Sequence, residues 1–501
     1  MRFNPETLKG KRDRLDEVLR IPGLVERVVA RHVRGAAKVT RIPRVWEPGG
    51  GASLFRVEAE GGTYFLKAKH QSVAVESRLE CEAAFSATPS LRNEHEFLRE
   101  LAGPAVPAVR FYEEAESFCF LAVEWLDPFD AGLDRLDPPG ILAVWERIEG
   151  DVRDLFARGI VHTDVHEHNL RFRGERPVLC DFEEARRLVQ DVPFERSLDY
   201  EGRNRYGDVG RFPDGKGAIE GFTCLVRLRR VLQERARRCL PEWLGGLKFD
   251  CECPYNLDPL QAPDDRIYQS VSCGGLVLPG QRGPGDRRFS LLEYVLLKAA
   301  VRGGPVTHLD VGCNLGTFCV RAASLPFVER SVGVDAHEDY VRAARVLAFL
   351  SDAGRASFHR RTCGVDRIAG PLGPFDVISM LSVYHHVADR DAFLDDVAAG
   401  SPRFLLAEFA VQDRYYPDRG TVSAEIEHVR SRLGFADARV VAASPDYGRP
   451  LVLFARRRIA RLDRVVGRLI CSRFAWIARA ALAVADRWVG SAGRRAGGGD
   501  A

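Results

Sequence analysis

The most informative stretch of this 501-residue chain is THLDVGCNLGTF, residues 307–318. It begins with an apolar run typical of a buried strand and continues with Gly312 and Gly316. Glycines after a strand let the backbone approach a nucleotide closely, and the start of the next helix offers free N–H groups. The stretch therefore predicts a strand, a nucleotide-binding loop and a helix in direct succession.

The segments that follow repeat this alternation. Apolar runs recur as SVGVDA (331–336), FDVISML (375–381) and FLLAEFA (404–410), with helix-length segments between them. This order predicts a parallel, doubly wound α/β sheet. Asp335 ends the second strand, nineteen residues after Gly316, where an acid suits ribose hydroxyls. On these residues alone the ligand is either NAD or S-adenosylmethionine.

The spacing D-x-G-x-x-x-G, together with FDVISMLSVYHHV further on, resembles the class I S-adenosylmethionine methyltransferases. The resemblance covers about residues 265–455 and implies that S-adenosylmethionine is the cofactor. It places Asp335 at the ribose, with Asp366 as a weaker candidate on the adenine side. The residues that it places along the methionine and ribose side are Asp310, Gly312, Asn314 and Gly316.

The methyl acceptor is expected at the carboxyl ends of the same strands, because ligands of doubly wound sheets bind there. Glu408 ends one of these strands, and Arg282, with Gln281 beside it, is expected to close over the site or grip an anionic acceptor. A solvated loop arginine is the alternative for Arg282. The turn after FDVISML supplies Tyr384 and His385 as substrate contacts and His386 as the catalytic candidate. A helix start with a packed histidine is the alternative for the histidine pair.

A second motif, GIVHTDVHEHNLRF, occupies residues 159–172. It spaces His162, Asp164 and Asn169 as H-x-D-x-x-x-x-N, and Asp181 ends an apolar strand twelve residues after Asn169. Phosphoryl transfer needs one carboxylate to accept the hydroxyl proton, and a carboxamide plus a carboxylate to hold Mg²⁺. The motif therefore predicts a phosphoryl-transfer loop.

Upstream of this motif, Lys67 ends the strand TYFLK and Glu94 lies on the next predicted helix. A Lys–Glu pair that holds the α- and β-phosphates of ATP has this order. Lys69 lies on the same side of the strand at a spacing of two and is the competing candidate.

Residues 40–240 resemble the protein-kinase-like fold, and HTDVHEHN is closer to the HGDLHPGN-type loop of aminoglycoside-, choline- and lipopolysaccharide-kinase-like enzymes than to HRDLKPEN. The resemblance implies ATP and Mg²⁺, with Asp164 as catalytic base. His166 stands where protein kinases have Lys, which favours a sugar or small-molecule hydroxyl as substrate. The other residues that the resemblance implicates are Asn169 and Asp181 for Mg²⁺, Lys67 and Glu94 for phosphate, and Glu124, Trp125 and Leu126 as the adenine-binding hinge.

Some residues depart from the kinase pattern. The glycine-rich loop is PGGGAS (48–53), the metal position reads Asp-Phe-Glu, and there is no APE motif. His162 alone is also compatible with packing under the loop. Zinc sites built on His162, His166 and His168, or on Cys239, Cys251 and Cys253, are the weaker alternatives.

Composition indicates a soluble globular protein, with 46% apolar and 29% charged residues. The twelve cysteines have irregular spacings and the first residues carry no signal-peptide core, so we expect a cytoplasmic protein with reduced thiols. Residues 456–501 hold eleven Arg and three Asp, a net charge of +8 against a total of +3. Arg461, Arg464, Arg468 and Arg479, with Trp476, predict an amphipathic helix at the inner face of the membrane. Packing back on the methyltransferase domain, or pairing with another chain, is the alternative.

The predicted fold class is a two-domain chain: an α+β bilobal kinase-like domain, then an α/β doubly wound Rossmann-like methyltransferase, with an amphipathic tail. The predicted parts are a helical segment (1–38), the kinase-like domain (39–240), a linker (241–290), the methyltransferase domain (291–455) and the tail (456–501).

The expected function is phosphorylation of a glycan or small-molecule hydroxyl coupled to methylation; no nucleic acid partner is expected. LSVYHHV and LLAEFA resemble the bifunctional kinase–methyltransferases that terminate bacterial O-antigen polysaccharide, here with the domain order reversed. The alternatives are two independent tailoring activities, or a membrane-tethered methyltransferase with a non-catalytic nucleotide-binding kinase fold.

Overall fold

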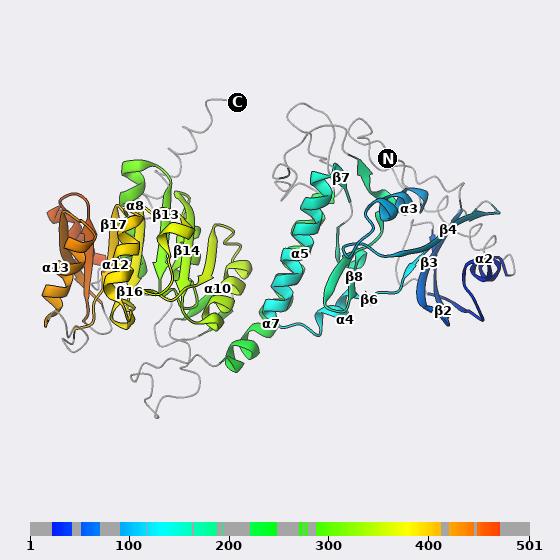
Figure 1. The fold of residues 1–501 in the computed structure, drawn as a ribbon, viewed down its shortest axis with the longest axis horizontal. Helices are drawn as coiled ribbons and strands as arrows, with labels where there is room; N and C mark the ends of the chain where they lie inside the picture. The colour runs from blue at the N-terminus through cyan, green and yellow to red at the C-terminus, as the bar shows by residue number, and fades with distance from the viewer. Residues whose placement is uncertain are drawn as a thin grey trace. The chain divides into compact units, whose positions relative to one another are not determined.

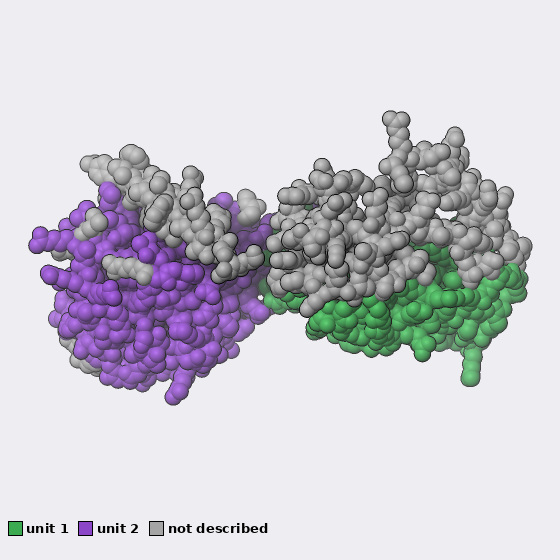
Figure 2. Space-filling model, turned by 90° about the horizontal axis from the view of Figure 1, so that it is seen from above, with its two compact units in different colours: residues 1–235 green, residues 236–501 purple. Residues whose placement is uncertain are grey.

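The chain folds into two compact units, residues 1–235 and 236–501, in a computed structural model (Figures 1 and 2). The boundary falls within helix α7 (Gly221–Gly246), the same helix that contains the predicted boundary at residue 240. The structure describes residues 23–42, 52–70, 91–116, 118–162, 165–187, 194, 221–247, 270–273, 276–278, 287–411, 420–444 and 448–470.

The first unit contains an antiparallel sheet in the order β1-β2-β3-β5-β4. Its central hairpin turns at Glu60 and Gly61, and the next residue, Gly62, adopts a φ of 120° that favours glycine. Helix α2 (Leu24–His32) buries Val28 and Val29 against apolar residues of this sheet. The strands are β1 (Lys38–Arg41), β2 (Ala52–Ala59), β3 (Gly62–His70), β4 (Val109–Ala115) and β5 (Phe118–Glu124).

The rest of the first unit combines helices with short hairpins. Helix α5 (Pro138–Ala157) begins at Asp137, whose carboxylate accepts the N–H of Gly140 at 2.8 Å, and proline occupies its first turn. The other helical elements of the first unit are α3 (Leu91–Glu100), α4 (Phe129–Leu133) and the 3₁₀ turns η2 (Glu167–Asn169) and η3 (Phe182–Glu184). Its short strands form one sheet of β6 (Asp127–Pro128), β8 (Leu170–Arg173) and β9 (Arg176–Leu179), and a separate pair of β7 (Ile160–Val161) and β10 (Arg186–Arg187).

The second unit is built on a sheet in the order β15-β14-β13-β16-β17-β19-β18. The strands from β15 to β17 are parallel, as predicted, and β19 runs antiparallel to both of its neighbours. Strand order therefore reverses at β13, which places β14 on one side and β16 on the other. The strands are β13 (Val306–Val311), β14 (Val328–Asp335), β15 (Ala356–Arg360), β16 (Val377–Leu381), β17 (Phe404–Glu408), β18 (Asp437–Ala443) and β19 (Pro450–Ala455).

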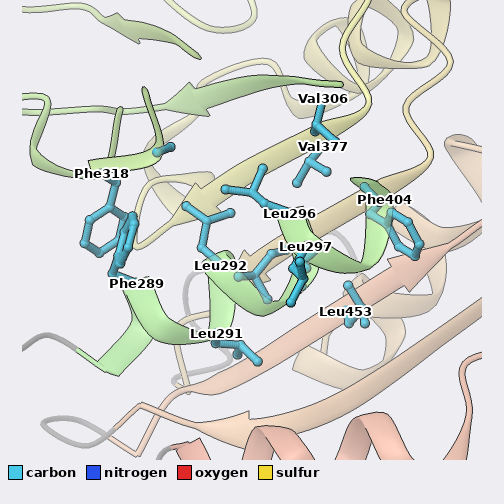
Figure 3. Close-up of a cluster of buried hydrophobic side chains, with 14 of the residues drawn as sticks. Phe289, Leu291, Leu292, Leu296, Leu297, Val306, Phe318, Val377, Phe404 and Leu453 are labelled. Atoms are coloured by element: carbon cyan, nitrogen blue, oxygen red, sulfur yellow. The ribbon is translucent and has the colours of Figure 1, made fainter. Parts of the chain in front are cut away.

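Helices cover both faces of this sheet. Along β17, Phe404 and Leu406 belong to one buried cluster and Leu405 and Ala407 to another, because alternate residues of a strand face opposite sides. Figure 3 shows apolar side chains of α8 (Arg287–Gly303) packed on the first of these faces. The remaining elements are α9 (Thr317–Ala323), α10 (Glu338–Leu350), α11 (Ala369–Leu372), α12 (Arg390–Ala399), α13 (Val422–Arg432), η6 (Tyr384–His386) and the hairpin β11 (Val271–Cys273) and β12 (Leu276–Leu278).

The first part of the predicted tail packs on the second unit. Helix α14 (Arg461–Ile470) buries Ile470 in the α8 cluster, and Asp463 accepts hydrogen bonds from Tyr294 and Lys298 of α8. This part follows the alternative of packing back on the domain. Trp476 and Arg479 lie outside the described residues, so membrane contact stays a prediction. Within the described residues, no helix is both long and apolar enough to cross a membrane.

Candidate functional site

In the second unit, the loop after β13 is shaped by its glycines. Gly312 and Gly316 adopt φ values of 70° and 71°, which L side chains rarely adopt. A Cβ atom at Gly312 would lie 2.5 Å from the side chain of Val383, and one at Gly316 would lie 2.4 Å from the ring of Phe358. The loop can therefore pass this close to β15 and to the turn after β16 only with glycine at both positions.

Asn314 and Asp335 meet at the opening of this loop. The backbone N–H groups of Asn314 and His337 donate to the two carboxylate oxygens of Asp335, at 2.9 and 3.0 Å. Burial raises the pKa of Asp335, and these two N–H groups oppose the shift. The amide oxygen of Asn314 is buried and has no hydrogen-bond partner among the described residues. A buried acceptor of this kind at the predicted ribose position fits a ligand hydroxyl or amine.

Asp310 lies one residue before the end of β13 and is 4% exposed. Ser379 Oγ donates to its carboxylate at 2.6 Å. Burial raises the pKa of Asp310 to about 7, while the Ser379 hydrogen bond and the charge of Arg288 act in the opposite direction. Asp366, on the predicted adenine side, is exposed and accepts the N–H of Thr362 at 2.7 Å within its own loop.

Two of the predicted substrate contacts, Tyr384 and Glu408, are buried. Tyr384 is fully buried, and its hydroxyl donates to Glu425 at 2.6 Å. Glu408 and Arg288 are both 0% exposed and form an ion pair at 2.7 Å, with the Ser382 hydroxyl also donating to Glu408. Both side chains anchor the turn after β16 to its neighbours, and their contact with the acceptor stays a prediction.

The two histidines of that turn differ in accessibility. His385 is buried, and burial, followed by the nearby His386 and Arg449, lowers its pKa to about 3. His386 is exposed, and its ring centroid lies 4.1 Å from that of His385. Partial burial and Arg449 lower the pKa of His386, so its imidazole is neutral at pH 7. His386 is thus the member of the pair that an acceptor can reach.

Arg449 is a candidate site residue that sequence reasoning missed. It precedes β19, and the N–H of Phe409 at the end of β17 donates to the adjoining Pro450 carbonyl at 3.2 Å. This register places Arg449 at the carboxyl edge of the parallel strands, beside the two histidines whose pKa it lowers. The sequence contains 73 Lys and Arg residues, and no spacing distinguishes this one.

In the first unit, Lys67 lies between two carboxylates. Its Nζ is 2.8 Å from Glu94 and 2.7 Å from Asp181, residues that are far apart in the sequence. Burial opposes the charge on Lys67, but the two carboxylates outweigh burial and raise its pKa. Burial raises the pKa of Glu94, whereas for Asp181 the effect of burial is outweighed by Lys67 and the pKa is lowered. The predicted Lys–Glu pair is therefore present, with Asp181 as a third member.

Lys69, the competing candidate, has a different partner. It is buried and forms an ion pair with Glu183, the acid of the Asp-Phe-Glu sequence. Asn93 on α3 donates to the carbonyls of Glu183 and Ala185 at 3.1 and 2.9 Å. The Asp-Phe-Glu turn is thus held to β3 by two lysines and to α3 by an asparagine.

The residues of GIVHTDVHEHNLRF have separate roles. His162 is buried, its Nε2 lies 2.9 Å from the Cys180 carbonyl, and its ring packs on Phe182, as the packing alternative states. The ring of His166 accepts the N–H of His168 at 3.1 Å. Asn169 is buried, and its backbone carbonyl accepts the N–H of Cys180, the residue before Asp181, at 2.8 Å.

Other predicted residues stand as follows. The carboxylate of Glu124 accepts the N–H of Ala108 at 2.8 Å and pairs with Arg173, and Trp125 N–H donates to the Thr63 carbonyl at 3.3 Å. A hinge built on Glu124, Trp125 and the buried Leu126 therefore has the Glu124 side chain engaged within the protein. Predicted residues that lie outside the described ones are Asp164, Gln281, Arg282, Cys251 and Cys253.

Residues 309–400 match the family model described as a methyltransferase domain. The chain therefore contains a methyltransferase domain, as predicted, and the cofactor of that domain is S-adenosylmethionine. The glycine-shaped loop, the buried Asn314 acceptor and Asp335 fit this cofactor. Among curated proteins, none matches the chain.

Solved structures resemble parts of the chain. The bifunctional kinase-methyltransferase WbdD is 22% identical, with a TM-score of 0.31, over 39% of this chain and 44% of WbdD. The N-terminal domain of EvdMO1, solved in the presence of SAH and D-fucose, is 15% identical with a TM-score of 0.31, over 38% of this chain and 90% of that one. The methyltransferase domain of bacterial CtHen1 is 14% identical with a TM-score of 0.28, over 33% of this chain and 97% of that one. The match thus spans less than half of WbdD.

Proposed function

We propose that the chain is a bifunctional enzyme of surface polysaccharide biosynthesis. Its first unit would phosphorylate a glycan or small-molecule hydroxyl with ATP, and its second unit would methylate the new phosphate. The observation that carries the kinase part is the buried Lys67 held between Glu94 and Asp181, in a chain that also contains a methyltransferase domain.

The charges of the first unit support phosphoryl transfer. Lys67 and Glu94 form the inner pair, and Asp181, whose side chain is 40% exposed, is the carboxylate that an incoming ion can reach. Mg²⁺ would neutralise charge on the phosphates when bound by Asp181 and Asn169. Asp164 would accept the proton of the acceptor hydroxyl as that oxygen forms its new bond to the γ-phosphorus, and ADP leaves with the electrons of the broken P–O bond.

The charges beside η6 support an anionic methyl acceptor. Arg449 offers a cation, and His386 an exposed neutral imidazole that can donate one N–H. S-adenosylmethionine supplies the methyl group when bound, and the electron pair of the broken C–S bond stays on sulfur. A phosphate monoester is already ionised, so no residue has to remove a proton from it. Positioning of the phosphate oxygen by Arg449 and His386 would therefore be the main contribution of the protein.

A second candidate function is favoured by the lowered pKa of His386. A neutral, exposed imidazole can also accept the proton of a hydroxyl, so methylation of a hydroxyl independent of the kinase unit is the alternative. A further alternative is a first unit that binds ATP without transferring phosphate.

Mass spectrometry of glycan acceptors incubated with the full chain tests these functions. With ATP and S-adenosylmethionine, we expect phosphate and methyl on the same acceptor; with S-adenosylmethionine alone, we expect neither. Asp164→Asn should abolish phosphorylation and methylation while binding of S-adenosylmethionine persists. The control is Glu175→Gln, at an exposed position in the β8–β9 turn, and it should change neither phosphorylation nor methylation. Undiminished methylation by Asp164→Asn would exclude the sequential reaction. ATP binding without phosphate on any acceptor would favour the non-catalytic first unit.

A further inference from the structure

A chain of hydrogen bonds crosses the centre of the second unit's sheet and includes two residues of β13, the strand that leads into the candidate cofactor loop. Ser331 Oγ lies 2.8 Å from His308 Nδ1, and His308 Nε2 lies 2.9 Å from Ser379 Oγ. Ser379 Oγ in turn donates to Asp310 at 2.6 Å. His308, Ser331 and Ser379 are each 0% exposed. The chain links three neighbouring strands and ends on an acid of the candidate cofactor site.

The strand register explains why these side chains meet. His308 pairs with Ser331 of β14, and Asp310 pairs with Ser379 of β16. His308 and Asp310 are two residues apart, so both point to the same face of β13. Polar groups so deeply buried carry a desolvation cost that hydrogen bonds must offset. A row of apolar residues at these positions would fill the same space without that cost. Packing alone therefore does not account for this row of hydrogen-bonded residues.

The direction of each hydrogen bond follows from the acid at its end. An ionised Asp310 can only accept, so the single hydroxyl hydrogen of Ser379 is donated to it. Ser379 must then accept from the Nε2–H of His308, and the unprotonated Nδ1 accepts from Ser331. Burial lowers the pKa of His308 to about 3, so the ring is neutral and carries one N–H, as this order requires. Each hydrogen bond of the row is therefore donated in the same direction, from Ser331 toward Asp310.

We propose that Ser379 and His308 are positioning residues of the cofactor site, which hold the Asp310 carboxylate ionised and in one orientation for the cationic methionine portion of S-adenosylmethionine. This inference rests on the proposed binding of that cofactor by the second unit. The ammonium group of the cofactor is a cation, and a carboxylate shielded from water attracts a cation more strongly than an exposed one does. Ser379 acts on Asp310 directly, and His308 acts through Ser379.

Other charges near Asp310 set the pH range in which the effect appears. Arg288 favours the ionised carboxylate and Asp335 opposes it. The groups facing Asp310 are Arg288 from α8, Asp335 from β14, the Cys319 thiol from α9, Ser379 from β16 and His308 from its own strand. Because the pKa of Asp310 is raised to about 7, cofactor affinity should weaken as pH falls through neutrality. Loss of the Ser379 hydroxyl removes a group that lowers this pKa, so the midpoint should move to higher pH.

Calorimetric titration of the full chain with S-adenosylhomocysteine, repeated across neutral pH, tests the inference. Ser379→Ala should weaken binding about tenfold, the loss expected for a hydrogen bond to a charged group, and raise the pH midpoint. Ser379→Thr, which restores the hydroxyl, should recover most of the affinity. The matched control is Ser290→Ala, which changes a buried serine of α8 that is not part of this row of hydrogen bonds. This variant should bind S-adenosylhomocysteine like the unmodified protein.

A second measurement does not depend on the stability of the alanine variant. Nitrogen-15 NMR of labelled histidine, assigned by loss of the signal in His308→Gln, should show His308 neutral with its proton on Nε2. A proton on Nδ1 would overturn the inference, as would an unchanged affinity and pH profile in Ser379→Ala. If the unmodified chain fails to bind S-adenosylhomocysteine, the proposed function fails as well. If Asp310→Asn weakens binding while Ser379→Ala does not, only the positioning role fails.

Discussion

The two candidate sites handle buried charge in opposite ways. In the first unit, the Lys67 ammonium lies between the carboxylates of Glu94 and Asp181, so each charge depends on a side chain far away in sequence. In the second unit, Asp335 is held by backbone N–H groups and Asp310 by a neutral hydroxyl. In a site of the first kind, removal of one side chain leaves a buried charge without its partner. A site of the second kind depends chiefly on the path of the backbone.

The largest effect is therefore expected from Lys67→Met. Removing one partner of a buried ion pair leaves an uncompensated charge and lowers the free energy of unfolding by about 3–5 kcal/mol. The pKa of Glu94 is already raised by burial, and protonated Glu94 needs no cation. The deficit should accordingly be small at acid pH and grow as pH rises through the pKa of Glu94. Urea unfolding at several pH values measures it.

The control for that experiment is Lys38→Met in the same unit. Lys38 is 77% exposed and lies 3.6 Å from Glu58, and an exposed pair of this kind contributes about 0–1 kcal/mol. If Lys67→Met lowers the free energy of unfolding no more than Lys38→Met does, the mutual dependence of the three charges is contradicted. A Lys67→Met/Glu94→Met double variant more stable than Lys67→Met alone would strengthen it.

A smaller effect is expected from Gly312→Ala, which alters the backbone on which the second site depends. The φ of 70° and the 2.5 Å approach to Val383 together should cost roughly 1–3 kcal/mol of stability and strongly reduce binding of S-adenosylhomocysteine. Gly354→Ala, where no atom lies within 4 Å of the added Cβ, should leave both unchanged. Equal behaviour of the two variants in thermal unfolding and calorimetry would show that the loop tolerates a side chain.

The smallest effect is expected for two residues within η6, Tyr384 and His386. Tyr384→Phe removes the hydroxyl that donates to buried Glu425 and should lower stability by about 1–2 kcal/mol, with the KM for the acceptor unchanged. His386→Gln should leave stability unchanged and slow methyl transfer, because this side chain is exposed. A raised acceptor KM in Tyr384→Phe would instead show that Tyr384 contacts the substrate.

Local pattern was enough to predict much of the second unit. Apolar runs with glycine after the first strand correctly predicted the parallel strands and the loop at Gly312 and Gly316. These features are readable because a buried strand, a positive φ and a helix start each restrict the residue types at their own positions. The pairing of Lys67 with Glu94 was also predicted, from the order of the two residues along the chain and from the resemblance to a family.

Features that depend on distant strands meeting could not be read from the chain. Sequence spacing left Lys67 and Lys69 as rivals, and only the fold assigns Glu94 and Asp181 to one and Glu183 to the other. It likewise suggested no role for Arg449 or for the chain through His308. Which polar side chains become partners depends on sheet register and burial. Register and burial arise only when residues tens of positions apart are brought together by the fold. A local sequence pattern does not specify which distant residues will meet.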